Sequence, residues 1–181
     1  MAVHRQAVAT ALLLTAMALT MVDPAYPQGV DSDVQAVLNE LYQTTPIAKT
    51  LATEAKAILV FPNVYKAGFI VGAQHGRGEL VKNGQHAGYY NIAAASYGLQ
   101  AGVQGFSYAM FFMKDSALSY FEKSAGFEVG VGPSVVVVDA GKAKSLTTTT
   151  ARDDVYAFIY GQKGLMAGLG LQGSKITKVG Q

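Results

Sequence analysis

Few residues in this chain could carry acid–base or metal chemistry, and their spacing forms no familiar catalytic set. The 181 residues include no cysteine and three histidines, of which His75 and His86 flank an Asn83-Gly84 hairpin signal. Two histidines without a nearby paired carboxylate make a weak zinc site, so we interpret them as surface residues. We therefore expect no metal ion and no other cofactor.

Motifs for nucleotides and for nucleophilic catalysis fail on their context. Residues 168–173 read GLGLQG and fit the G-x-G-x-x-G pattern of dinucleotide-binding folds. That fold needs a helix at this point and an acidic residue about 20 positions later, which the residues up to Gln181 do not supply. No G-x-S-x-G elbow occurs, and the acidic residues lack the paired spacing of a general acid and base. We expect a protein that is not an enzyme and has no catalytic residue.

The remaining chemistry-bearing side chains are cations, which gather in two parts of the sequence. A basic residue close to an anionic membrane adds about 1 kcal/mol to binding, so both groups are candidate lipid-binding residues. The alternative interpretation is that they only solvate the ends of loops. The formal net charge of +2 gives no indication of nucleic-acid binding. The candidates are Lys66, His75, Arg77 and Lys82 in the first group and Lys142, Lys144, Arg152 and Lys163 in the second.

The first 25 residues are typical of a secretory signal peptide. His4 and Arg5 precede an uncharged, largely apolar run over residues 6–22, which Asp23-Pro24 ends. The run is shorter than the roughly 20 residues of a membrane-spanning helix, although an uncleaved anchor remains an alternative. We expect export to the periplasm or cell envelope, with no lipidation because no cysteine follows the run. A single domain over residues 26–181 should remain.

Two helices are expected at the start of this domain. Ser32 and Gln35 have the spacing of a capping box, and apolar residues follow at helical intervals to about Thr44. Thr45-Pro46 then resembles the beginning of a second helix, which should reach about Lys56. A short buried strand over residues 58–61 is expected to end before Pro62.

A sheet should form the rest of the domain. Only one of the 20 glycines precedes Gly68, and residues 69–74, 99–104, 127–132 and 165–172 alternate large apolar residues with glycine or glutamine. Glycines repeated on one face favour sheet curvature or close packing, with a ligand-lining groove as the alternative. The expected class is α+β: a curved, largely antiparallel sheet, barrel-like in the extreme case, with amino-terminal helices and one short internal helix.

Further along the chain, three smaller features are expected. Asp115-Ser116 should cap the internal helix, which should end before Gly126. The polar stretch over residues 142–152 is interpreted as a loop or an edge strand. The last strands, within residues 154–179, should complete the sheet as a meander.

Four segments occur in the order known from one domain family. They are KAILVFPNVYKAGFIVG at 56–72 with HGRG at 75–78, YGLQAG at 97–102, FEVG at 127–130, and VYAF at 155–158 followed by KGLMAG at 163–168 and LQGS at 171–174. These segments resemble the SYLF domain, also called the Ysc84-like or DUF500 domain, over roughly residues 34–179. The resemblance implies lipid or membrane binding, since eukaryotic members bind phosphoinositides and assist actin-linked membrane remodelling, whereas bacterial members are commonly exported.

The chain departs from the eukaryotic members in two respects. It has no SH3 or FYVE partner domain, so it looks like the bacterial type, and actin regulation is not expected. The amino-terminal helix of eukaryotic members is basic, whereas residues 23–67 here hold five acidic and three basic residues. This balance argues against phosphoinositide attraction to that helix.

The sequence therefore predicts an exported, non-enzymatic domain that binds a lipid or membrane surface through basic side chains and an apolar groove. The alternative is an envelope structural or protein-interaction module without a lipid ligand, whose partners would be envelope proteins. A small membrane-embedded barrel is a weaker alternative, because it needs strands of about 9–11 residues and several segments here are shorter.

Overall fold

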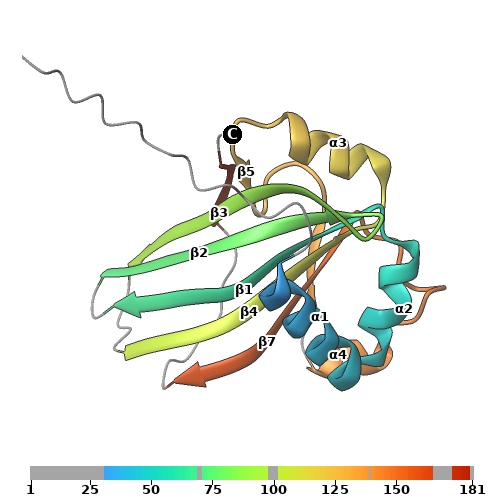
Figure 1. Cartoon of the computed structure of the whole chain (residues 1–181), viewed down its shortest axis with the longest axis horizontal. Coiled ribbons are helices and arrows are strands. Elements are labelled where there is room, and N and C mark those ends of the chain that lie inside the picture. The colour runs from blue at the N-terminus through green and yellow to red at the C-terminus, as the bar shows by residue number, and fades with distance from the viewer. Residues whose placement is uncertain (1–30, 69–70, 98–101, 139, 165–172, 180–181) are drawn as a thin grey trace, which may run out of the picture.

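The structure is built around one curled eight-stranded sheet with helices on both of its faces (Figure 1). It is a computed structural model that describes residues 31–68, 71–97, 102–138, 140–164 and 173–179. The strand order is β5-β8-β3-β2-β1-β4-β7-β6, and every neighbouring pair is antiparallel except β6 and β7. The expected α+β class and the curved, largely antiparallel sheet are confirmed. The predicted signal peptide lies outside the described residues.

The elements have the following bounds. The helices are α1 (Ser32–Thr44), α2 (Pro46–Glu54), α3 (Asp115–Lys123) and α4 (Ala140–Ser145). The strands are β1 (Ala57–Gly68), β2 (Val71–Lys82), β3 (Gln85–Tyr97), β4 (Gly102–Phe112), β5 (Phe127–Glu128), β6 (Val135–Val138), β7 (Val155–Gly164) and β8 (Lys175–Lys178).

Helices α1 and α2 occur where the sequence predicts them, but the capping box was wrong. The N-cap of α1 is Asp31, which makes no side-chain capping bond. Its backbone N–H instead donates to Glu79 Oε2 of β2 at 2.9 Å, so a buried carboxylate of the sheet fixes the start of this helix. Pro46 begins α2, as expected for a residue that lacks an N–H.

The two faces of the sheet belong to two hydrophobic clusters. On what we call the α1 face, apolar residues of α1 and α2 pack on strand residues that include Val60, Phe111 and Phe158. On the opposite α3 face, Leu118 and Phe121 of α3 pack on a second set of strand residues. Because both faces are covered there, the covered half of each central strand is buried on both sides and does not alternate between buried and exposed residues. In β4, every residue from Phe106 to Phe112 is buried.

Strand β1 does not end at Pro62, as the sequence predicts, but continues through it in a bulge. Between the pairs Phe61–Tyr108 and Val64–Phe106, two residues of β1 lie opposite one residue of β4. The same offset of one residue occurs against β2. Proline is tolerated at a bulge because the ladder there needs no N–H. Ser107 Oγ donates to the Pro62 carbonyl oxygen at 2.8 Å, which satisfies the acceptor that the bulge displaces.

A second bulge lies beside the first, on the other side of β4, in strand β7. Ser107 of β4 pairs with Tyr160 of β7, whereas Gly105 pairs with Lys163, so β7 carries the extra residue. Gly161 supplies it with a φ of 63°, a conformation that other residues rarely adopt. Bulges bend a strand and increase its twist, so two aligned bulges account for the curl at this level.

Several predictions for the later elements were wrong. Residues 142–152 are not a loop or edge strand throughout, since α4 includes Lys142 and Lys144. The final strands form no meander, because β8 pairs with β3 and β5 while β7 pairs with β4 and β6. The internal helix α3 is confirmed, but its predicted cap at Asp115-Ser116 is wrong, because the N-cap is Lys114 and makes no side-chain capping bond. The segments at 98–101 and 165–172, including the GLGLQ part of the dinucleotide-like pattern, lie outside the described residues.

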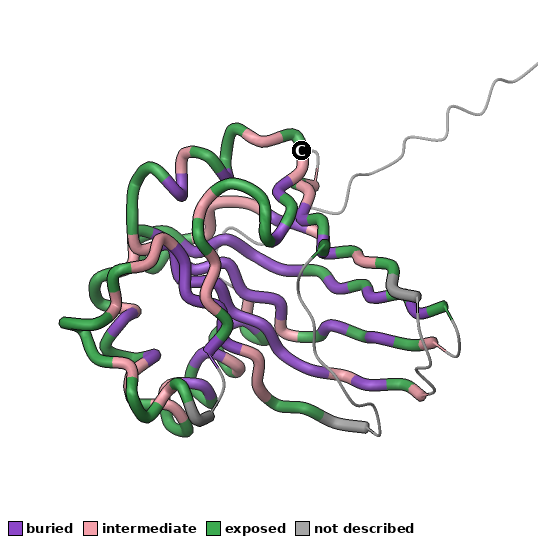
Figure 2. The backbone as a smooth tube through the Cα atoms, turned by 180° about the vertical axis from the view of Figure 1, so that it is seen from behind, coloured by how far each residue is buried: buried purple, intermediate pink, exposed green. Residues whose placement is uncertain are grey.

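In β2, and at Gln104 of β4, the glycine and glutamine positions of the alternation are the buried ones. In β2, Gly72 and Gln74 are buried on the α3 face, while Val71 on the α1 face is 64% exposed. The same inversion occurs in β4, where Gln104 is buried and Val103 is exposed. Figure 2 shows the continuous buried core giving way to this alternation toward the uncovered strand ends. Residues 127–132 show the opposite pattern, because Phe127 and Val129 are buried whereas Gly130 and Gly132 are exposed.

The close approach of Phe61 to Gly78 gives a test of this packing. A Cβ at Gly78 would meet the Phe61 ring and would lie 2.5 Å from the Val60 carbonyl oxygen. We expect Gly78→Ala to lower the free energy of unfolding by about 2 kcal/mol in urea titrations. The matched control is Gly105→Ala, where the nearest atom is 3.8 Å away, and it should be neutral or stabilising by about 0.5 kcal/mol. Equal effects of the two changes would contradict this account.

The Asp154 carboxylate makes part of the stability dependent on pH. It accepts the Ser134 N–H at 2.8 Å and contacts Lys114 Nζ at 2.8 Å, and these interactions hold its pKa below the usual range, with the Lys114 bond the largest cause. Because this pKa is lower in the folded than in the unfolded protein, the ionised carboxylate stabilises the fold above a pH of about 4. That stabilisation is lost as the pH falls through the pKa of the folded protein.

We therefore expect Asp154→Asn to lower the free energy of unfolding by about 1 kcal/mol at pH 7 and by less at pH 3. Urea unfolding at the two pH values measures the difference. Asp115→Asn is the control, because its carboxylate is 84% exposed and its change should have little effect at either pH. A loss for Asp154→Asn that is the same at both pH values would exclude the ionised carboxylate as the cause.

Candidate functional site

Beyond α1 and α2, none of the described helices lies over the α1 face of the sheet (Figure 1). Three large apolar side chains are exposed there on adjacent strands: Tyr65 at 60%, Val71 at 64% and Val103 at 64%. Their described neighbours on this face are mostly alanines. We call this surface the open face; it consists of Tyr65, Ala67, Val71, Ala73, His75, Ala93, Ala95 and Val103, all exposed.

A cavity of about 390 Å³ lies between the open face and the beginning of α1. It holds charges of both signs, with Asp31 and Asp33 from the helix start and Arg77 from β2. We call it the charged cavity. Its described lining is Asp31, Asp33, Val34, Pro62, Asn63, Tyr65, His75, Gly76, Arg77, Gly78, Glu79 and Tyr89.

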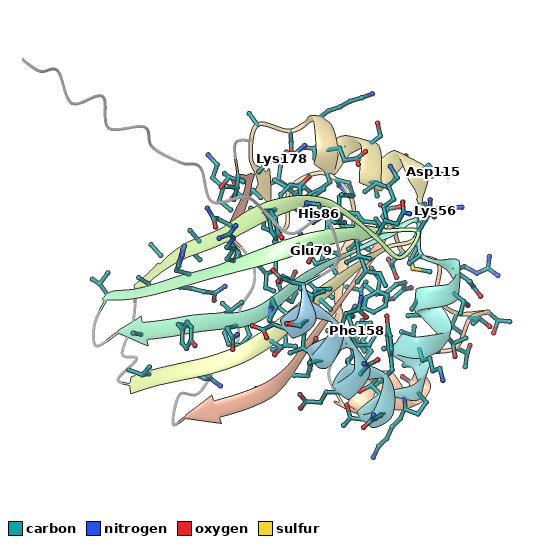
Figure 3. All side chains as sticks on the ribbon, viewed as in Figure 1. Lys56, Glu79, His86, Asp115, Phe158 and Lys178 are labelled. Carbon is teal, nitrogen blue, oxygen red and sulfur yellow. The ribbon has the colours of Figure 1, made fainter. Side chains whose placement is uncertain are left out.

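The inner wall of the charged cavity is a fixed polar cluster. Glu79 is 1% exposed; its Oε1 lies 2.8 Å from His86 Nδ1 and its Oε2 accepts the Asp31 N–H (Figure 3). The Arg77 guanidinium lies over the Tyr89 ring, 4.8 Å from its centroid, and the His86 ring packs against Tyr89 as well. Cation–π contact holds the Arg77 charge at the cavity.

The Glu79–His86 contact corrects one statement about the histidines. The sequence was interpreted as offering them no paired carboxylate, yet Glu79 is seven positions before His86 and reaches it across the β2–β3 pair. The pair is structural, because Glu79 is also occupied by the start of α1. Within the described residues, no group of three or more acidic or histidine side chains is placed to hold a metal ion.

A second cavity, of about 510 Å³, adjoins the charged cavity. The two share Pro62, Asn63 and Tyr65, so the Tyr65 side chain stands between them. We call it the apolar cavity after the valine, proline and aromatic side chains in its described lining, which also includes Glu40, Asn63 and Ser107. That lining is Val37, Glu40, Pro62, Asn63, Val64, Tyr65, Val103, Gly105, Phe106, Ser107 and Gly161.

The first group of predicted lipid-binding residues is divided between different parts of the sheet. His75 and Arg77 line the charged cavity on the α1 face. Lys66 is on the α3 face, where it is 5% exposed and is paired across strands with Gln74 and Gln104. Lys82 is at the opposite end of β2, with its Nζ 3.5 Å from Glu122 Oε1.

The second group is also spread out. Lys142 and Lys144 are exposed on α4, and Arg152 is exposed before β7. The backbone of Lys163 is near the other end of β7, opposite Gly105. The structure therefore brings together only His75 and Arg77 among the eight predicted residues.

The sequence did not single out Tyr65, Val71, Val103, Asp31 or Asp33. In an alternating strand, large apolar residues are normally assigned to the core, and only the bulge at Pro62 shows that Tyr65 faces outward. Asp31 and Asp33 were noted only as acidic residues of a helical region. The clearest signal for them was their position at the start of α1.

Tyr108 and Tyr160, two of the tyrosines in the described strands, have a shifted pKa. Burial raises the pKa of Tyr108, and burial together with Glu40 raises the pKa of Tyr160. Both phenols are therefore neutral near pH 7. Among the described helices, none is both long and apolar enough to cross a bilayer. What the site offers is a recognition surface with apolar, cationic and anionic parts.

Comparison with known proteins finds one family match, in the second part of the chain. The family model described as "Ysc84: Las17-binding protein actin regulator" matches residues 93–181, from the middle of β3 through β8. No curated protein matches the chain. The family is associated with binding and regulation. The match confirms the resemblance for the three segments from residue 97 onward, whereas the segment at 56–78 lies outside it. Residues 93–181 belong to the SYLF (Ysc84-like) family.

Proposed function

We propose that this protein is a non-enzymatic lipid-binding domain that places its open face on a membrane surface. The observation that carries the proposal is the exposure of Tyr65, Val71 and Val103 on adjacent strands, on a face that none of the described helices covers. Contiguous exposed apolar surface on a soluble domain marks a site of interaction with membranes, ligands or proteins. The membership of residues 93–181 in a binding family agrees with this.

The charges around the open face also support membrane contact. The open face contains no acidic residue, and Arg77 and His75 stand on the same strand as Val71 and Ala73. Lysine and arginine at such a border favour phosphate groups. With a formal net charge of only +2, the apolar side chains supply at least as much of the binding as electrostatic attraction does.

The proposal includes export. It rests on the apolar run of residues 6–22 and the stop at Asp23-Pro24. Residues 26–181 would then act as one domain in the periplasm or cell envelope. Of the eight basic residues chosen from the sequence, His75 and Arg77 are the ones assigned to the lipid contact.

The open face can be tested with two isosteric changes, Val71→Thr and Val103→Thr, made together in the full-length protein. Threonine keeps the shape and the strand preference but adds a hydroxyl that resists transfer into lipid. We expect binding to vesicles of phosphatidylethanolamine and phosphatidylglycerol to weaken roughly tenfold in co-sedimentation at low salt.

The matched control is the pair Val131→Thr and Val137→Thr, which are 52% and 40% exposed outside the open face. This pair should bind as the unchanged protein does. The amino-terminal segment is identical in all forms, so its own affinity for lipid cancels in the comparison. Failure of the unchanged protein to bind either neutral or anionic vesicles, or equal losses in both pairs, would refute the proposal.

Protein binding is the second candidate function, and the description of the family model favours it. That description names Las17 binding for the family. The open face would then receive an envelope protein in place of lipid. Retention of a specific partner from envelope extract by the unchanged protein, lost in the Val71→Thr and Val103→Thr pair and without any vesicle binding, would favour this candidate.

A further inference from the structure

The charged cavity is unusual for a phosphate site because it pairs a cation with carboxylates. Arg77 is held on one side by its stacking on Tyr89, 4.8 Å from the ring centroid. On the other side are Asp31 and Asp33 at the start of α1. Neither aspartate makes an ion pair with any residue in the part of the chain that the structure describes.

Charges of both signs in one cavity restrict its ligand. A purely anionic head group would be attracted by Arg77 but repelled by the two aspartates. A purely cationic ligand would be attracted by the aspartates but repelled by Arg77. Like charges at such short range cost binding energy, whereas complementary ones specify orientation. The fitting ligand is therefore a zwitterion that carries a phosphate and an amine a few bonds apart. The exposed Tyr65 adds an aromatic face that attracts an ammonium group.

The apolar cavity continues the site on the other side of Tyr65. The two cavities share Pro62, Asn63 and Tyr65, and the apolar cavity includes Val103 of the open face. Its volume of about 510 Å³ is within the range of about 300–1,000 Å³ of small-molecule sites. A ligand with its polar end in the charged cavity can therefore run an aliphatic chain past Tyr65 along apolar surface.

We propose that these adjoining cavities bind one phospholipid with a zwitterionic, aminoethyl-phosphate head group. The phosphate lies at Arg77 and His75, the amine lies between Asp31 and Asp33, and an acyl chain occupies the apolar cavity. This inference rests on the proposed lipid-binding function and adds the class of head group and its orientation. Recognition of the amine by carboxylates makes phosphatidylethanolamine the preferred ligand over phosphatidylglycerol.

The test uses the full-length protein and short-chain lipids below their micelle concentrations. Dihexanoyl phosphatidylethanolamine and dihexanoyl phosphatidylglycerol differ only in the head group, and calorimetric titration gives an affinity for each. We expect the ethanolamine lipid to bind more tightly. Asp33→Asn should weaken it roughly fivefold and leave the glycerol lipid unchanged or tighter. Arg77→Gln should weaken both lipids, because both carry a phosphate.

Each change has a matched control in the same chain. Asp115→Asn removes a carboxylate from the first turn of α3, as Asp33→Asn does in α1, so any effect on helix charge is the same. Arg152→Gln removes an exposed guanidinium before β7. Neither control should change either affinity. Thermal unfolding of all forms shows whether a loss of binding comes from a loss of fold.

The outcomes separate this inference from the broader function. Equal affinity for the two lipids, with no effect of Asp33→Asn, would overturn the head-group assignment, while the vesicle result for Val71→Thr and Val103→Thr would still stand. Glycerophosphoethanolamine without acyl chains serves as a third probe. If it bound as tightly as the lipid, the site would belong to a soluble phosphoamine, and the lipid assignment would be wrong.

Discussion

One extra residue in the central strand β1 determines how the two faces of this sheet are used. At the bulge around Pro62, the alternation of β1 shifts by one, so Phe61 and Val64 both point to the α3 face. Downstream, this shift exposes Tyr65 and buries Lys66. The Ser107 hydroxyl holds the bulge through the Pro62 carbonyl, and the neighbouring bulge of β7 at Gly161 extends the bend. The open face and both cavities depend on these two neighbouring bulges.

Burial and exposure then follow from where helices cover the curled sheet. Near α1, α2 and α3, both faces are covered, and the strands supply large apolar side chains to two clusters. Beyond the bulges, the α3 face holds glycines and the buried amides of Gln74 and Gln104, while the α1 face carries apolar side chains outward. An outward apolar face costs solubility unless it meets a partner, which is the physical reason to assign it to lipid.

The charged cavity connects this surface to the helical part of the molecule. Glu79 accepts the N–H of Asp31 and contacts His86, so one buried carboxylate positions the α1 start, its aspartates and the β2–β3 pair together. Buried carboxylates persist where their oxygens are hydrogen-bonded, as these are. The same contact places negative side chains opposite Arg77. A weakly charged protein thus acquires a locally strong and oriented electrostatic site.

By itself, the sequence determined the class of fold, helices α1 to α3, the Asn83-Gly84 hairpin and the family, because these follow from local periodicity, turn chemistry and ordered motifs. It did not determine the strand order, since β8 pairs with β3 through contacts far apart in the chain. Nor did it show that Val71 and Val103 face outward, or that Asp31 and Arg77 line the same cavity. Alternation shows only that a strand has two faces. The bulges, and the helices that cover parts of each face, decide which face meets solvent.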